Sequence, residues 1–250
     1  MTLSVGNFSH NFCESKIFND QPEIFNAISS LFITIIPFFY NFPRNVALRR
    51  VTFILMLNGI FSSYYHFNLN WFGKQLDELT MIFALYIGTI EIINIINSHD
   101  KKNYLLYDFF TITMTSINTL PNYDLIFPFM FFIGVLYLLF NIYILKQSLP
   151  IIDVTCLKCS FYGSIFWILS EIFCNRFFYF GHSLWHIMFP LGFIKFIEIL
   201  DNAIIDSNII KTSYIWKRFQ HYLYHCVLPL WVFISYSFSL MMMMTKMEES

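Results

Sequence analysis

Stretches of mainly apolar residues, separated by short polar or proline-containing breaks, recur along the chain from residue 24 to residue 204. A helix needs roughly 20 such residues to cross a bilayer core of about 30 Å. Seven stretches approach this length: Ile24–Tyr40, Val46–His66, Leu79–Ile96, Tyr104–Leu120, Leu125–Leu145, Leu157–Cys174 and Ser183–Ile204. The pattern predicts an all-α polytopic membrane protein, a bundle of seven transmembrane helices.

An eighth apolar stretch, Cys226–Met244, is also long enough to span, or it could lie in the interface or pack on the bundle; we favour seven spans. The first 22 residues have neither the basic start nor the continuous apolar core of a cleaved signal peptide, so we expect the N-terminus to be retained. The expected parts are an extracytoplasmic segment (1–22), a seven-helix domain (23–210) and a cytoplasmic or partly membrane-embedded segment (211–250).

Composition agrees with a membrane protein, since 57% of the residues are hydrophobic and only 12% are charged. The net charge of −1, with no cluster of Lys and Arg, gives no basis for binding nucleic acid. The five cysteines are too few and too dispersed for a disulfide-dense secreted scaffold. The sequence gives no indication of an oligomeric state.

The basic residues predict the orientation, because cytoplasmic loops of membrane proteins are enriched in Lys and Arg. With the N-terminus outside, the loops divide ten against three: Arg44, Arg49, Arg50, Lys101, Lys102, Lys146, Lys158, Lys211, Lys217 and Arg218 inside, and Lys16, Lys74 and Arg176 outside. We therefore expect a lumenal or extracytoplasmic N-terminus and a cytoplasmic C-terminus. The membrane would be that of the endoplasmic reticulum or Golgi in a eukaryote, and the inner membrane in a bacterium.

Five polar residues lie at the outer ends of the predicted spans. Ser62 and His66 are four apart and share a helix face, and so do His182 and His186. Asp77 opens the third predicted span after a loop of about ten residues and so returns to the same membrane surface. Ionisable groups in membrane helices are costly and tend to mark functional sites, so we expect these five to face one interior space.

Zinc fits this set of residues. Three neutral imidazoles with an open fourth position form a catalytic coordination pattern, and zinc brings the pKa of a bound water to about 7. Asp77 could orient or deprotonate that water, and Ser62 could donate a hydrogen bond to the oxyanion formed when a carbonyl is attacked. The pattern thus predicts hydrolysis of a lipid-soluble amide or ester.

The segments "SSYYH", "LDELTM" and "HSLWHI", with "CE…EIFNAIS" near the N-terminus, resemble the alkaline ceramidases over nearly the whole chain. These belong to a wider group of seven-helix hydrolases that includes the Per1-like lipid remodellers and the adiponectin receptors. The resemblance implies zinc held by His66, His182 and His186, with Ser62 and Asp77 assisting attack of water on the amide of ceramide. The products would be a sphingoid base and a free fatty acid.

Two alternatives stay open within the wider group. One is a Per1-like lipid ester hydrolase, which usually has a signal peptide and a cysteine-bearing lumenal domain. The other is an adiponectin-receptor-like membrane receptor with structural zinc, which has the opposite orientation. The short N-terminal segment and the charge bias favour the ceramidase interpretation.

The resemblance also implies a calcium site in the N-terminal segment, and the matching positions are Asn11, Phe12, Glu14, Lys16 and Glu23. The match is incomplete, because Asn11 stands where an aspartate is expected and Lys16 where an oxygen ligand is expected. Calcium takes six or more oxygen ligands. We therefore expect weak or absent calcium dependence.

Similar ceramidases also join two cysteines that correspond to Cys13 and Cys174, and an oxidising compartment would permit this disulfide.

The chain departs from the family at Ser170, where an aspartate is usual; the neighbouring Glu171 could take over its role, or the role could be lost. A further HxxxH pair, His221 and His225, falls on the predicted cytoplasmic side, away from the five polar residues, and is interpreted as interfacial.

Overall fold

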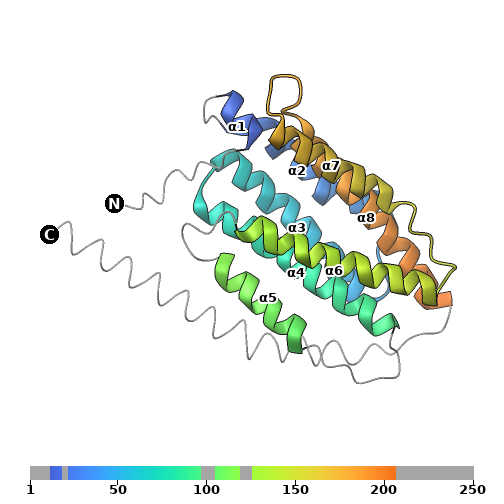
Figure 1. The fold of residues 1–250 in the computed structure, drawn as a ribbon. Coiled ribbons are helices and arrows are strands. Elements are labelled where there is room, and N and C mark those ends of the chain that lie inside the picture. Colours follow the sequence, from blue (N-terminus) through green and yellow to red (C-terminus); the bar gives the residue numbers. More distant parts are fainter. Residues whose placement is uncertain (1–11, 19–21, 97–104, 119–125, 207–250) are drawn as a thin grey trace. The chain divides into compact units, whose positions relative to one another are not determined.

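The computed structural model describes residues 12–18, 22–96, 105–118 and 126–206, and in these residues all regular secondary structure is helical, as predicted (Figure 1). The elements are α1 (Cys13–Ile17), α2 (Ile24–Ile35), the 3₁₀ helix η1 (Ile36–Phe39), α3 (Val46–Asn68), α4 (Trp71–Ile96), α5 (Leu105–Asn118), α6 (Ile126–Ser148), α7 (Leu157–Ile172) and α8 (Gly181–Asp206). The predictions for 211–250, including the eighth stretch, lie outside the described residues.

Three of the described helices are long and apolar enough to cross a membrane, by length and composition: α3, α4 and the Phe129–Ser148 part of α6. The apolar segment that begins the bundle, Ile24–Phe39, is shorter. Its last turn tightens into η1, where Pro37 stands at the beginning. A proline is tolerated at the start of a helix because its missing N–H would have no partner there.

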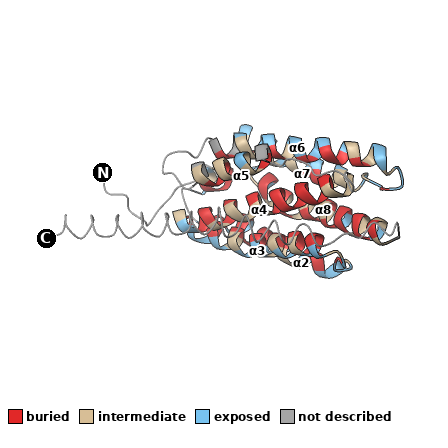
Figure 2. Cartoon of the chain, turned by 90° about the horizontal axis from the view of Figure 1, so that it is seen from below, coloured by how far each residue is buried: buried red, intermediate tan, exposed pale blue. Residues whose placement is uncertain are grey.

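The helices pack in sequence-adjacent pairs around α2 and α4. The pairs are α3 with α4 and α7 with α8, while α2 contacts both α3 and α8, and α4 contacts α5 and α6. Figure 2 shows buried residues concentrated on α4 and α8, whereas α6 exposes one side. The exposed side of α6 includes Phe129, Phe140 and Tyr143. An apolar helix with large exposed apolar side chains is typical of a surface that faces lipid.

Helices α7 and α8 approach each other closely at two glycines of α8. A Cβ on Gly181 would lie 2.4 Å from the carbonyl oxygen of Phe166, and one on Gly192 would lie 2.4 Å from Oγ of Ser160. Small residues at helix interfaces let backbones come together in a membrane. Gly181 thereby determines where the first turn of α8, which contains His182, rests on α7.

The connection between α3 and α4 corrects one prediction. We expected the third span to begin at Leu79 after a loop of about ten residues, but α3 ends at Asn68 and α4 already begins at Trp71. Leu69 ends α3 in the left-handed conformation, with φ of 47°, and the Asn70 side chain accepts from the Gly73 N–H at 2.7 Å. This N-cap starts α4 early. Asp77 therefore lies in the second turn of α4 rather than at the end of a loop.

Candidate metal centre

Three histidines from two helices meet in the interior. His66 comes from the last turns of α3, and His182 and His186 come from the first turns of α8. One ring nitrogen of each lies within 4.8 Å of the others, and all three side chains are buried. The spacing of four residues in α8 places its two rings on one face, with centroids 4.6 Å apart. These three nitrogens could act as ligands of one metal ion.

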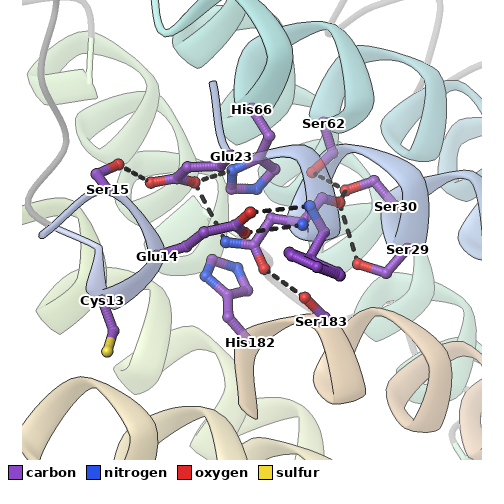
Figure 3. Close-up of polar contacts among 12 residues, drawn as sticks. Cys13, Glu14, Ser15, Glu23, Ser29, Ser30, Ser62, His66, His182 and Ser183 are labelled. Atoms are coloured by element: carbon purple, nitrogen blue, oxygen red, sulfur yellow. Dashed lines mark hydrogen bonds and ion pairs between the residues drawn. The ribbon is translucent and has the colours of Figure 1, made fainter. Parts of the chain in front are cut away.

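Two of the imidazoles are held through Nδ1 by side chains of α2 and of its N-cap residue, and Figure 3 shows the N-cap residue Glu23 beside His66. Nδ1 of His66 lies 2.5 Å from Oε2 of Glu23, and Nδ1 of His186 lies 2.9 Å from Oγ of Ser29. Ser30 lies farther away, with its Oγ 3.3 Å from Nδ1 and 3.5 Å from Nε2 of His186. Outer partners of this kind orient metal-binding histidines and determine their tautomer. With Nδ1 engaged in both rings, Nε2 is the ligand atom that each offers.

The third imidazole faces a carboxylate from α7. Nδ1 of His182 lies 3.8 Å from Oε1 of Glu171, whose Oε2 accepts from the backbone N–H of Cys13 at 2.9 Å. Ser170 instead donates to the carbonyl of Trp167 in its own helix. Of the two residues at the position where the family pattern is broken, Glu171 is the one that faces the histidines.

Asp77 and Ser62 lie beside this cluster, where α3 packs on α4. The Asp77 carboxylate is buried, accepts from Nδ2 of Asn58 at 2.7 Å and lies beside the Ser62 side chain. Oγ of Ser62 also lies 3.1 Å from Oγ of Ser30. Ser62 lies one turn before His66 on α3. A carboxylate and a hydroxyl thus lie next to a potential metal ligand.

The short helix α1 covers the histidines and is joined covalently to the end of α7. A disulfide links Cys13 to Cys174, with Cα atoms 5.3 Å apart. The neighbouring Phe12 ring lies with its centroid 4.6 Å from that of His182 and 5.7 Å from that of His66. The disulfide therefore keeps an aromatic ring packed against two of the three imidazoles.

The carboxylates of this covering segment act as acceptors within the protein. Glu14 accepts from the N–H groups of Phe25 and Asn26, at 2.8 Å and 3.0 Å, where α2 begins. Burial raises the pKa of Glu14, although these two hydrogen bonds oppose the shift. Glu23 accepts from Ser15 and from the Asn26 side chain as well as facing a histidine. Glu14 thus joins α1 to the start of α2, and Glu23 joins both of them to His66.

The structure brings the five polar residues of the sequence analysis to one place: Ser62, His66, Asp77, His182 and His186. Of the positions matched to a calcium site, Glu14 and Glu23 are buried, Lys16 is exposed, Phe12 packs on the imidazoles, and Asn11 lies outside the described residues.

Four residues that contribute to the site were missed by the sequence analysis: Asn26, Ser29, Ser30 and Asn58. Asn58 carried a usable signal, because it lies one turn before Ser62 on an otherwise apolar helix. Residues 26, 29 and 30 share one face of α2, but the sequence does not show what that face packs against.

Comparison with known proteins identifies the family. The family model described as Ceramidase matches residues 7–232, so the chain belongs to the ceramidase family. Among curated proteins, the chain is similar to alkaline ceramidase 1 of Mus musculus, with 21% identity over 229 residues. That alignment covers 85% of this chain and 84% of the mouse protein.

Proposed function

We propose that this protein is an intramembrane zinc-dependent amidohydrolase that cleaves the N-acyl amide of ceramide to a sphingoid base and a free fatty acid. The observation that carries the proposal is the buried cluster of three histidine nitrogens within 4.8 Å of one another, with Asp77 and Ser62 at its side. Membership of the ceramidase family and the similarity to a mouse alkaline ceramidase support ceramide as the substrate.

The donor set fits zinc better than a hard cation. Imidazole nitrogens suit zinc, whereas calcium and magnesium prefer oxygen ligands. His66, His182 and His186 would hold the ion, and three protein ligands leave the fourth position open, as in catalytic zinc sites. Zinc in such a site supplies a Lewis acid that polarises a carbonyl and lowers the pKa of water.

Asp77 and Ser62 then have separate tasks. The Asp77 carboxylate takes a proton from the water that attacks the amide carbon, and returns it to the amide nitrogen as the C–N bond breaks. The Ser62 hydroxyl, one turn before His66, donates a hydrogen bond to the carbonyl oxygen as it gains negative charge. Water is thereby added across the amide, giving a carboxylic acid and an amine. The two side chains lie next to each other, so both can reach the same substrate amide.

The surroundings favour a lipid substrate and an outward-facing N-terminus. The helices present large exposed apolar side chains, including Phe67 and Phe72 on α3 and α4 near the cluster, along which acyl chains could lie. In a seven-span bundle with the orientation given by the basic residues, α1 lies on the extracytoplasmic side. A disulfide at that end is compatible with an oxidising compartment.

The proposal is tested by purifying the protein in detergent, measuring bound zinc by elemental analysis, and measuring fatty acid release from ceramide. We expect one zinc per chain and activity in the wild type. His186→Ala should lose both zinc and activity, whereas Asp77→Ala should keep zinc and retain only a small residual kcat. His225→Ala, from the second HxxxH pair, is the matched control and should keep both.

Two outcomes would contradict the proposal. Absence of zinc from an active wild-type protein would exclude the metal mechanism. Bound zinc without ceramide hydrolysis would exclude the substrate, and the same preparation would then be tested with ester lipids and for a receptor-like role without hydrolysis.

A further inference from the structure

Asn58 is a buried amide in the middle of the apolar run "FILMLNGIF" of α3, with 4% of its surface exposed. It precedes Ser62 by four residues and His66 by eight, so all three lie along one face of the helix. A buried amide is costly in an apolar environment unless it is hydrogen-bonded. Its partners therefore indicate why this position is polar.

The amide nitrogen of Asn58 lies between groups of α4. Nδ2 is 2.7 Å from Oδ1 of Asp77, 3.0 Å from the backbone carbonyl oxygen of Asp77 and 3.0 Å from Oγ1 of Thr80. A carbonyl and an ionised carboxylate can only accept hydrogen bonds, so the nitrogen of the amide, and not its oxygen, must face Asp77. The orientation of Asn58 is thus determined by the residue to which we assign proton transfer.

We propose that Asn58 is a positioning residue that holds the carboxylate of Asp77 in the orientation required for proton transfer. This proposal rests on the proposed function and adds a residue to it. The hydrogen bond from Asn58 holds the carboxylate from the facing helix α3, one turn away from Ser62, which lies beside the same carboxylate. Proton transfer depends steeply on such geometry, because the acceptor must lie within hydrogen-bonding reach of the water.

A purely structural role for a buried asparagine has a different geometry elsewhere in the same chain. Asn141 of α6 is also buried, and its Nδ2 donates to the carbonyl of Tyr137 in its own helix at 2.8 Å. The bonds of Asn58 instead cross between helices and reach the carboxylate of Asp77. Asn141→Leu is therefore a matched control for the removal of a buried amide from a membrane helix.

The test compares Asn58→Leu, Asn58→Asp and Asn141→Leu by bound zinc and by kcat and KM for ceramide hydrolysis. Asn58→Leu removes the donor, and Asn58→Asp replaces it with an acceptor of the same size. We expect both to keep zinc at the wild-type level and to lower kcat about 10- to 100-fold, the usual effect of removing an outer partner in a metal site. KM should change little, and Asn141→Leu should resemble the wild type.

A double variant separates positioning from packing. In an Asp77→Ala background, Asn58→Leu should cause no further loss of kcat, because its effect runs through the missing carboxylate; an additional loss would overturn the proposal. A wild-type kcat in either folded, zinc-bound single variant would also overturn the proposal.

Folding defects are handled by the pair of variants. If only Asn58→Leu fails to fold, Asn58→Asp decides the question, and if neither folds, the role is structural and the proposal is wrong. A zinc-bound but inactive wild type would overturn the proposed function as well, whereas an active wild type with active Asn58 variants overturns this inference alone.

Discussion

Glu23 and His66, 43 residues apart in the chain, are joined twice: Nδ1 of His66 lies 2.5 Å from Oε2 of Glu23, and the Glu23 N–H donates to the His66 carbonyl at 2.9 Å. The first contact orients the ring, and the second joins the beginning of α2 to the end of α3. The pair therefore places Nε2 of His66 toward the other two imidazoles, although Glu23 itself would not touch the metal.

The first prediction is that Glu23 tightens zinc binding without being a ligand. Glu23→Ala should weaken zinc affinity about 10- to 100-fold, since outer partners of metal-binding histidines have effects of this size. Glu23→Gln should have a smaller effect, because its amide oxygen can still accept from Nδ1–H. Competition with a chromophoric chelator measures the affinity directly.

Glu198→Ala serves as the control for loss of a carboxylate. Glu198 lies twelve residues after His186 on α8, roughly 18 Å along the helix axis, and pairs with Lys195. Its removal should leave zinc affinity unchanged. Zinc affinity at the wild-type level in Glu23→Ala would show that the ring is oriented by other contacts.

The second prediction concerns the disulfide that holds α1 over the three histidines. Cys13→Ser should lower the free energy of unfolding by about 2–4 kcal/mol, as loss of a disulfide that closes a long loop usually does. It should also accelerate zinc loss to a chelator, because Phe12 would no longer be fixed against the imidazoles. Thermal unfolding in detergent, with and without a reductant, measures the first effect.

The matched control is the double variant Cys156→Ser and Cys159→Ser, which removes the two free cysteines of the described residues. Its unfolding temperature should equal that of the wild type and should fall equally when a reductant is added. If instead the reductant leaves both proteins unchanged, the link between Cys13 and Cys174 does not stabilise the fold.

The third prediction compares two glycines. A Cβ on Gly181 would lie 2.4 Å from the Phe166 carbonyl oxygen and 2.5 Å from Cβ of Ser170, so Gly181→Ala must move α8 away from α7. We expect destabilisation of about 1–3 kcal/mol, with weaker zinc binding because His182 is the next residue. At Gly88 the nearest atom would be Cγ2 of Val51 at 3.9 Å, an ordinary contact. Gly88→Ala should be neutral or stabilising by about 0.5–1 kcal/mol, and equal unfolding temperatures for the two variants would contradict the comparison.

The helical fold and the main polar residues were predictable because membrane helices obey strong constraints. Apolar length locates the helices, and the spacing of four residues places His182 beside His186. Hydropathy alone misplaced the start of α4, because the charged and polar residues around Lys74 and Asp77 resemble a loop on that scale. These side chains are buried, and Lys74 forms an ion pair with Glu78 at 3.2 Å, which makes their presence inside a helix tolerable.

The contributions of α2 were not predictable from the same rules. Ser29 and Ser30 are small polar residues that membrane helices often contain, and nothing in their own spacing shows that α2 lies between α3 and α8. Their role depends on tertiary packing, since Ser29 reaches His186 across 157 residues of sequence. Asn58 differs, because its place one turn before Ser62 on an otherwise apolar helix was visible in the sequence.

The fourth prediction is that calcium has little effect on this protein. The two oxygens of Glu14 accept backbone N–H groups of Phe25 and Asn26, and those of Glu23 face Ser15 and His66. Calcium takes six to eight oxygen ligands, and carboxylates already engaged by protein donors are poor candidates for that role. Added calcium or a calcium-selective chelator should therefore change ceramide hydrolysis by less than about twofold, whereas a zinc chelator should abolish it.

Glu14→Gln distinguishes an internal acceptor from a calcium ligand. In the internal role Glu14 completes the first turn of α2, where free N–H groups favour a negative charge, so the variant should lose about 0.3–1 kcal/mol of stability whether or not calcium is present. As a calcium ligand it would instead account for a calcium-dependent rise in the unfolding temperature, and the variant would abolish that rise. Thermal unfolding of both proteins with added calcium and with chelator decides between the two roles. Because Lys16 is exposed on the same short helix, Lys16→Ala is the control for a change of charge on α1 that leaves these hydrogen bonds in place.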